Sequence, residues 1–162
     1  MRLAAYQPDN PRNLGAMIRI AACFGVPLDV IEPCGFPFSP RAVRQSALDY
    51  AALAEIVRHD GWAAFRARQA GRLVLLTTAG DLALPCHRFL PSDIVMVGRE
   101  SAGVPREVHA AADLRLVIPM PGGGRSLNVA MAAGIALYEA MRQFMAARGE
   151  DVPRPGGFSP SG

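Results

Sequence analysis

Three short segments combine glycines with polar side chains of types that can bind phosphate or small molecules, and the first spans residues 10–19. Its sequence, Asn-Pro-Arg-Asn-Leu-Gly-Ala-Met-Ile-Arg, is expected to open a helix with Asn13 as a candidate N-cap. On that helix Arg12, Ala16 and Arg19 share the face opposite the apolar stripe. Two guanidinium forks beside a helix N-terminus match the shape and charge of a phosphate. The pattern predicts either a phosphate-binding site or an N-cap followed by solvated arginines.

The second segment follows a strand of the buried type at residues 94–97. Gly98 ends this strand, and a loop with Glu100 and Gly103 leads to Pro105, which is expected to open a helix. Ligands of α/β sheets bind at the carboxyl ends of strands, where backbone amides and carbonyls are free. The segment therefore indicates either a ligand-binding loop or a plain turn from strand to helix.

The third segment, residues 118–128, has the same layout of strand end, glycine loop and helix start. Ser126 and Asn128 are placed to cap the helix or to touch a ligand. Leu127 stands at the third glycine position of a GxGxxG pattern and no Lys follows, so generic nucleotide-binding folds fit poorly. We expect a small-molecule pocket shared by the second and third segments, with the strand end at residues 75–80 as a further wall.

Other chemistries find no support in the residue types. All 17 basic residues are Arg, which excludes Schiff-base and Ser-Lys catalysis. Because the histidines and cysteines lack metal-ligand spacing, we expect no bound metal. We expect the histidines to be surface or structural residues and the cysteines to be buried thiols. These residues are His59, His87, His109, Cys23, Cys34 and Cys86.

Chain length and composition limit the classes of protein to which this sequence can belong. With 162 residues, 51% of them hydrophobic, the chain is long enough for one packed domain. We assign this domain to residues 1–148 and expect residues 149–162, rich in Pro, Gly and Ser, to form a flexible tail. The sequence contains no secretory signal and no apolar run of membrane-spanning length, so we expect a cytoplasmic protein with no membrane partner.

Short apolar runs alternate with segments of helical period, which predicts an α/β fold with a parallel sheet flanked by helices. Residues 40–69 are expected to hold one or two amphipathic helices around an extended piece at residues 55–58. We expect strands at residues 3–6, 28–31, 73–77, 94–97 and 114–118, and helices at residues 14–24 and 127–147.

The last of these helices is apolar on nearly every face as far as Tyr138. A helix of this kind needs cover on all sides. Either it forms a homodimer interface, or it is the central core helix of a single chain.

Taken in order, the three segments resemble the motifs of the SPOUT (SpoU-type) RNA ribose 2′-O-methyltransferases. The matches are Asn10-Pro-x-Asn13-x-Gly15-x-x-x-Arg19, Gly98-x-Glu100-x-x-Gly103-Val-Pro105, and Ile118-Pro-Met through Arg125-Ser-Leu-Asn-Val-Ala130. Further matches at Ile31-Glu-Pro-x-Gly-Phe36, Leu48-Asp-Tyr50 and Leu137-Tyr-Glu139 are similar to the minimal branch, which methylates the tRNA wobble ribose. The resemblance covers residues 1–147.

The resemblance implies a six-stranded parallel sheet, a C-terminal trefoil knot and an obligate homodimer. It also implies S-adenosylmethionine as cofactor and tRNA, through its anticodon stem-loop, as partner. The substrate would be cytidine 34 or carboxymethylaminomethyluridine 34. Carried over residue by residue, the cofactor pocket would be lined by Leu76, Gly98, Glu100, Ile118, Ser126 and Leu127.

The same resemblance assigns roles to polar side chains. Arg19 would clamp the target phosphate and orient the 2′-hydroxyl, because a guanidinium stays protonated far above neutral pH. Asn13, Ser126 and Asn128 would build the rest of the catalytic site, which needs no metal. RNA contacts are expected from Arg12, Arg19, Arg41, Arg44, Arg125 and Tyr138. The sequence leaves two alternatives: the same transfer on another tRNA or rRNA site, or a non-catalytic RNA-binding module.

Arg99 is a departure from the family pattern, because relatives often carry a small residue or Pro at that position. The charge distribution fits an RNA substrate better than the net charge of +3 suggests. Residues 1–72 hold nine arginines against six acids, whereas residues 73–162 hold eight of each. The basic excess thus falls on the half that carries the expected RNA contacts.

Overall fold

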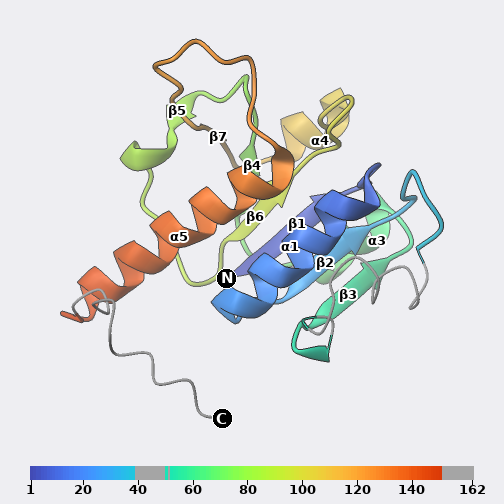
Figure 1. Cartoon of the computed structure of the whole chain (residues 1–162), viewed down its shortest axis with the longest axis horizontal. Helices are drawn as coiled ribbons and strands as arrows, with labels where there is room; N and C mark the ends of the chain where they lie inside the picture. Colours follow the sequence, from blue (N-terminus) through green and yellow to red (C-terminus); the bar gives the residue numbers. More distant parts are fainter. Residues whose placement is uncertain (39–49, 51, 151–162) are drawn as a thin grey trace.

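The computed structural model describes residues 1–38, 50 and 52–150, and its centre is a seven-stranded parallel sheet in the order β3-β2-β1-β6-β4-β7-β5 (Figure 1). Neighbouring strands pair in parallel throughout this order. The strands are β1 (Arg2–Tyr6), β2 (Leu28–Ile31), β3 (Ile56–His59), β4 (Leu73–Leu76), β5 (Leu82–Ala83), β6 (Ile94–Val97) and β7 (Leu114–Val117).

Helices cover both faces of the sheet, as the α/β prediction requires. On one face α1 (Pro11–Phe24) and α5 (Val129–Ala147) lie side by side (Figure 1). The other face packs against α3 (Trp62–Arg68) and α4 (Arg106–Ala111). A 3₁₀ turn, η2 (Leu84–Cys86), follows β5. Within the described residues, no helix has the length and apolar character that crossing a membrane demands.

The core consists of two apolar clusters, one on each face of the sheet. Leu3 and Ala5 of β1 point into the cluster beneath α1 and α5, whereas Ala4 and Tyr6 point into the cluster beneath α3 and α4. Since both faces are covered, the strands read as continuous apolar runs rather than as alternating patterns. This explains why periodicity located the central strands to within one residue at each end.

The start of α1 differs from the prediction. Asn10, not Asn13, is the N-cap: its side chain accepts a hydrogen bond from the Arg12 amide at 3.0 Å. Pro11 then occupies the first turn, where its missing N–H costs nothing. The assignment of Asn13 as cap was wrong, and its side chain is free for other contacts.

Two further expectations need correction. The sheet has seven strands rather than six, because the two-residue β5 was missed. Cys23 and Cys86 are exposed and Cys34 is partly exposed, so the prediction of buried thiols was wrong.

The extended piece expected at residues 55–58 is β3, and α3 follows it. Most of the helix expected before β3 falls in residues 39–49, outside the described residues. Arg41 and Arg44 lie in the same range, and most of the expected tail (151–162) is also outside the described residues.

Candidate active site

A cavity of about 650 Å³ opens where β4, β6 and β7 end and α1 and α5 begin. This is the edge of the sheet at which the second and third segments were expected to meet. Residues of all three segments line it, together with the strand end at Leu75–Thr78. All six side chains or backbones expected at the cofactor lie on its wall: Leu76, Gly98, Glu100, Ile118, Ser126 and Leu127.

One wall of this cavity is a tight turn after β6. Arg99 and Gly103 exchange two backbone hydrogen bonds of 2.9 Å, which close the turn. Gly103 has φ +63°, a left-handed conformation that favours glycine. A Cβ at Gly98 would lie 2.5 Å from the Gly103 carbonyl carbon, so no larger residue fits there. The two glycines of the second segment are therefore requirements of the backbone.

Side-chain hydrogen bonds connect the three segments across the cavity. Asn128 caps α5, because its Oδ1 accepts from the amides of Ala130 and Met131 at 3.0 and 3.3 Å. Its Nδ2 donates to Oδ1 of Asn13 at 3.0 Å, and Nδ2 of Asn13 donates to Oε1 of Glu100. Each amide thus has a fixed orientation. The chain Asn128–Asn13–Glu100 joins one residue of each segment.

Asp9 belongs to this cluster, and sequence reasoning missed it. Its carboxylate accepts hydrogen bonds from the amides of Glu100 and Ser101, each at 3.3 Å, and from the Ser101 hydroxyl. Asp9 directly precedes the first segment, so its place next to the motif was the one signal available. Nothing in the spacing indicated that it would face the loop after β6.

Asp9 and Glu100 form a coupled pair of carboxyl groups. Partial desolvation, a hydrogen bond with Asp9 and repulsion by its charge raise the pKa of Glu100 to about 8. The pKa of Asp9 falls to about 2, chiefly because it accepts that hydrogen bond from Glu100 and further ones from Ser101. At neutral pH the pair therefore holds one proton, on Glu100.

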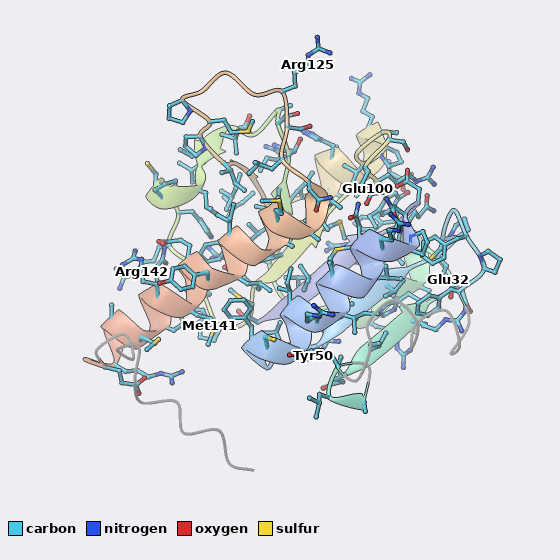
Figure 2. The ribbon with its side chains drawn as sticks, in the orientation of Figure 1. Glu32, Tyr50, Glu100, Arg125, Met141 and Arg142 are labelled. Atoms are coloured by element: carbon cyan, nitrogen blue, oxygen red, sulfur yellow. The ribbon has the colours of Figure 1, made fainter. Side chains whose placement is uncertain are left out.

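Three of the arginines expected to contact RNA, Arg12, Arg19 and Arg125, are among the described residues and lie outside the cavity or at its rim. Arg19 is exposed on α1, and its guanidinium carbon lies 5.1 Å from the centroid of the Tyr50 ring. Arg12 is exposed at the start of the same helix. Arg125 contributes to the cavity wall and extends from the loop before α5 away from the body of the molecule (Figure 2). The structure thus brings Asn13, Ser126 and Asn128 together but leaves Arg19 apart from them.

Tyr138 and Arg99 complete the positions singled out by sequence. Tyr138 is 55% exposed on α5, well beyond the cavity wall. Arg99 turns its guanidinium to the side-chain oxygen of Gln7, the residue that follows β1. This contact fastens the turn after β6 to the end of β1. Within the described residues, no group of three or more His, Cys, Asp or Glu side chains is arranged to hold a metal ion.

The sequence profile of the SpoU rRNA Methylase family matches residues 1–138. The chain belongs to the SpoU methylase family. A SpoU relative from Beijerinckia indica subsp. indica, named tRNA (cytidine(34)-2′-O)-methyltransferase, is 50% identical over 156 residues. That alignment covers 94% of this chain and 98% of the relative.

Solved structures agree with this SpoU assignment. One, described as "Structural insights into the 2-OH methylation of C/U34 on tRNA", has a TM-score of 0.85 and 40% identity, and covers 90% of this chain and 96% of that one. The SpoU methyltransferase AviRb of Streptomyces viridochromogenes, in complex with AdoMet, has a TM-score of 0.78 and 28% identity, and covers 90% of this chain and 61% of that one. The parallel sheet flanked by helices is therefore the SpoU fold.

The residues of the cavity fit S-adenosylmethionine (AdoMet), the ligand of that SpoU relative. Its volume of about 650 Å³ lies within the range of small-molecule sites. Leu76, Ile118 and Leu127 provide apolar surface for a flat base, and the strand ends provide free backbone groups. Glu100 and the hydroxyls of Thr77 and Thr78 add polar groups at the wall.

Proposed function

We propose that this SpoU methylase transfers a methyl group from S-adenosylmethionine to the ribose 2′-oxygen of the tRNA wobble nucleotide, cytidine 34 or carboxymethylaminomethyluridine 34. The observation that carries the proposal is the Asn128–Asn13–Glu100 chain, which joins the three sequence segments at one cavity. The relative from Beijerinckia indica, with its printed activity on cytidine 34, supports the choice of nucleotide.

The cavity would hold S-adenosylmethionine by shape and by backbone contacts. Leu76, Ile118 and Leu127 would enclose the adenine, and the turn at residues 98–103 would approach the ligand with backbone groups. When bound, the cofactor supplies a methyl group on a sulfonium, which an oxygen nucleophile can attack without a metal. The protein's own task is to bind both substrates and orient the 2′-hydroxyl.

Asn13 and Ser126 stand at the cavity wall with groups that can hydrogen-bond a hydroxyl, and Asn128 fixes the orientation of Asn13. Arg19 would bind the phosphate next to the target ribose, since its guanidinium remains a cation at neutral pH. It does not reach its own cavity wall, so we assign it to the cavity of a second subunit. Arg12, Arg125 and Tyr138, all exposed, would contact the anticodon stem-loop.

A homodimer follows from this assignment and from α5. Leu127 and the outer face of α5 expose a row of apolar side chains at helical spacing: Leu127 36%, Met131 59%, Ile135 40% and Tyr138 55%. One side of α5 lies in the core, whereas this row on its other side is exposed, which favours the homodimer alternative. A second copy would cover this row next to the cavity.

The proposal also includes the C-terminal trefoil knot, with which the packing of α5 onto α1 and β6 is consistent. It includes a cytoplasmic location as well.

The decisive experiment is methyl transfer from labelled S-adenosylmethionine to total tRNA, followed by mapping of the methylated nucleotide. We expect label on the ribose of position 34. Label at another tRNA or rRNA ribose would keep the chemistry and refute the substrate. Cofactor binding with no transfer to any RNA would instead indicate a non-catalytic RNA-binding module.

The role of Arg19 is tested by Arg19→Ala, with Arg68→Ala on the opposite side of the sheet as control. Arg68 is exposed at the end of α3 and carries the same charge. We expect Arg19→Ala to abolish turnover while S-adenosylmethionine binding is retained, and Arg68→Ala to behave as wild type. Loss of cofactor binding in Arg19→Ala would place this residue on the cofactor side and overturn its assignment.

A further inference from the structure

Asp9 lies in the loop between β1 and α1, but its hydrogen bonds go to the turn after β6. Oδ1 accepts from the Glu100 amide at 3.3 Å, and Oδ2 accepts from the Ser101 amide at 3.3 Å and from the Ser101 hydroxyl. A carboxylate with these contacts satisfies two backbone donors that the turn itself leaves unpaired, since the turn closes through Arg99 and Gly103.

The backbone of Asp9 is held from its other side. The Gly35 amide donates to the carbonyl of Pro8 at 2.9 Å, and Pro8 is buried. A Cβ at Gly35 would lie 2.9 Å from both Cα and Cβ of Asp9, so the two loops are in direct contact. Asp9 is therefore fixed between the loop after β2 and the turn after β6, and its carboxylate has little freedom to move away.

The turn that Asp9 binds carries Glu100, which ends the hydrogen-bonded chain from Asn128 through Asn13. Glu100 is exposed, so packing alone does not fix its side chain. We propose that Asp9 is a positioning residue of the methyl-transfer site: it holds the turn at residues 99–103 so that Glu100 stays bonded to Asn13. This rests on the proposed function and adds a fourth member to its site.

The charges of the pair agree with this geometry. Because Asp9 is ionised and Glu100 holds a proton at neutral pH, the two carboxyl groups attract rather than repel. The Asp9 carboxylate thus accepts hydrogen bonds from both the side chain and the backbone amide of Glu100. Replacing the carboxylate by an amide of the same shape removes an acceptor and brings an NH₂ group toward the Ser101 donors.

The test compares Asp9→Asn with Asp60→Asn, which removes the same charge from an exposed residue that does not line the cavity. We expect Asp9→Asn to lower kcat by about 10-fold to 100-fold, as misplacement by less than an ångström does, with the KM for tRNA unchanged. Amide hydrogen exchange should accelerate at Glu100 and Ser101, while the amides of β1 and α5 keep their protection. Asp60→Asn should match wild type in each measurement.

A second variant, Ser101→Ala, removes one contact of Asp9 from an exposed side chain and leaves the core untouched. It should lower kcat less than Asp9→Asn, and the two changes together should cost less than the product of their separate effects. Unchanged exchange at Glu100 and Ser101 in both variants would overturn the proposal. So would a kcat of Asp9→Asn equal to that of Asp60→Asn, or protection lost equally throughout the chain.

Hydrogen exchange needs no RNA, which separates this proposal from the proposed function. If wild-type protein methylates no tRNA, the proposed function fails, and exchange at Glu100 and Ser101 still decides whether Asp9 holds the turn. If wild-type protein is active and Asp9→Asn retains full activity, the proposed function stands and the role of Asp9 in it is refuted.

Discussion

The guanidinium carbon of Arg19 lies 5.1 Å from the centroid of the Tyr50 ring. Arg19 is exposed on α1, and Tyr50 is half-buried in the segment that precedes β3. A cation over an aromatic face is attracted by the partial negative charge that the ring quadrupole places on that face, and the contact restricts a long side chain to few rotamers. Tyr50 therefore presents Arg19 in a fixed direction before RNA arrives.

This contact predicts different outcomes for two replacements of Tyr50. Tyr50→Phe keeps the ring and should retain wild-type kcat/KM for tRNA. Tyr50→Leu removes it and should lower kcat/KM by about fivefold, equivalent to about 1 kcal/mol for an exposed cation–π contact. Steady-state kinetics with tRNA measure both, and S-adenosylmethionine binding serves as the internal control. Equal losses in the two variants would show that the hydroxyl, not the ring, matters.

Two glycines near the cavity allow a controlled test of whether the turn at residues 98–103 contacts the cofactor. A Cβ at Gly98 would lie 2.5 Å from a backbone carbon of Gly103, whereas a Cβ at Gly122 would meet nothing within 4 Å. Gly98→Ala must therefore move the turn, and we expect S-adenosylmethionine affinity to fall at least about tenfold. Gly122→Ala should leave the affinity unchanged. Calorimetric titration distinguishes the two, and equal affinities would show that the turn does not contact the cofactor.

The carboxyl pair predicts how stability depends on pH. The pKa of Glu100 is about 8, above its usual 4.5, so the folded state binds its proton more tightly than the unfolded chain does. Its contribution to stability is present below about pH 4.5 and is lost as pH rises through about 8. The pKa of Asp9 is about 2, so its contribution is present above its usual 3.8 and is lost as pH falls toward 2.

Glu100→Gln isolates the loss of stability that the raised pKa of Glu100 predicts at high pH. Urea unfolding at about pH 5 and about pH 9 should show wild-type protein losing more stability than the variant between these values. The comparison cancels other titrations, including the N-terminal amine, whose pKa is lowered mainly by burial. An identical pH dependence in both proteins would show that Glu100 has an ordinary pKa.

The row of apolar side chains on α5 predicts the assembly state. Ile135→Glu places a charge in the middle of this row, where a dimer would bury it without a partner, so the variant should sediment as a monomer. Ala63→Glu, at an exposed position of α3, adds the same charge elsewhere and should remain a dimer. If Arg19 acts in the partner's cavity, the monomer should also lose methyl transfer. A dimeric, active Ile135→Glu would refute the interface.

The sequence predicted the central strands and a pocket shared by the second and third segments, because both depend on local signals. Buried strands appear as apolar runs, and the glycines at positions 98 and 103 are required by their own backbone. Asn13 and Asn128, both predicted at the site, line the cavity, although Asn13 was first assigned as a cap. The capping signal was ambiguous, because Asn10 and Asn13 both precede apolar helical residues.

What escaped prediction depends on contacts between distant residues. Asp9 and Ser101 are separated by 92 positions and meet only because β1 and β6 are neighbours in the sheet. A single-sequence pattern carries no information on that adjacency. The exposure of Cys23 was missed for a related reason: an apolar-type residue on a helix predicts burial only if another element covers that face.

Two ion pairs of equal length give the last prediction, which concerns stability. Asp29 is fully buried and pairs with Arg2 at 2.7 Å, with Nε2 of His59 also 2.7 Å away, whereas Asp81 pairs with Arg115 at 2.7 Å with its side chain 68% exposed. Removing a buried partner leaves uncompensated polar groups in the core, so Asp29→Asn should lower the free energy of unfolding by about 3 kcal/mol. Asp81→Asn should lower it by less than about 1 kcal/mol, because solvent screens an exposed pair. Urea unfolding measures both values, and equal losses would show that burial does not decide the strength of these pairs.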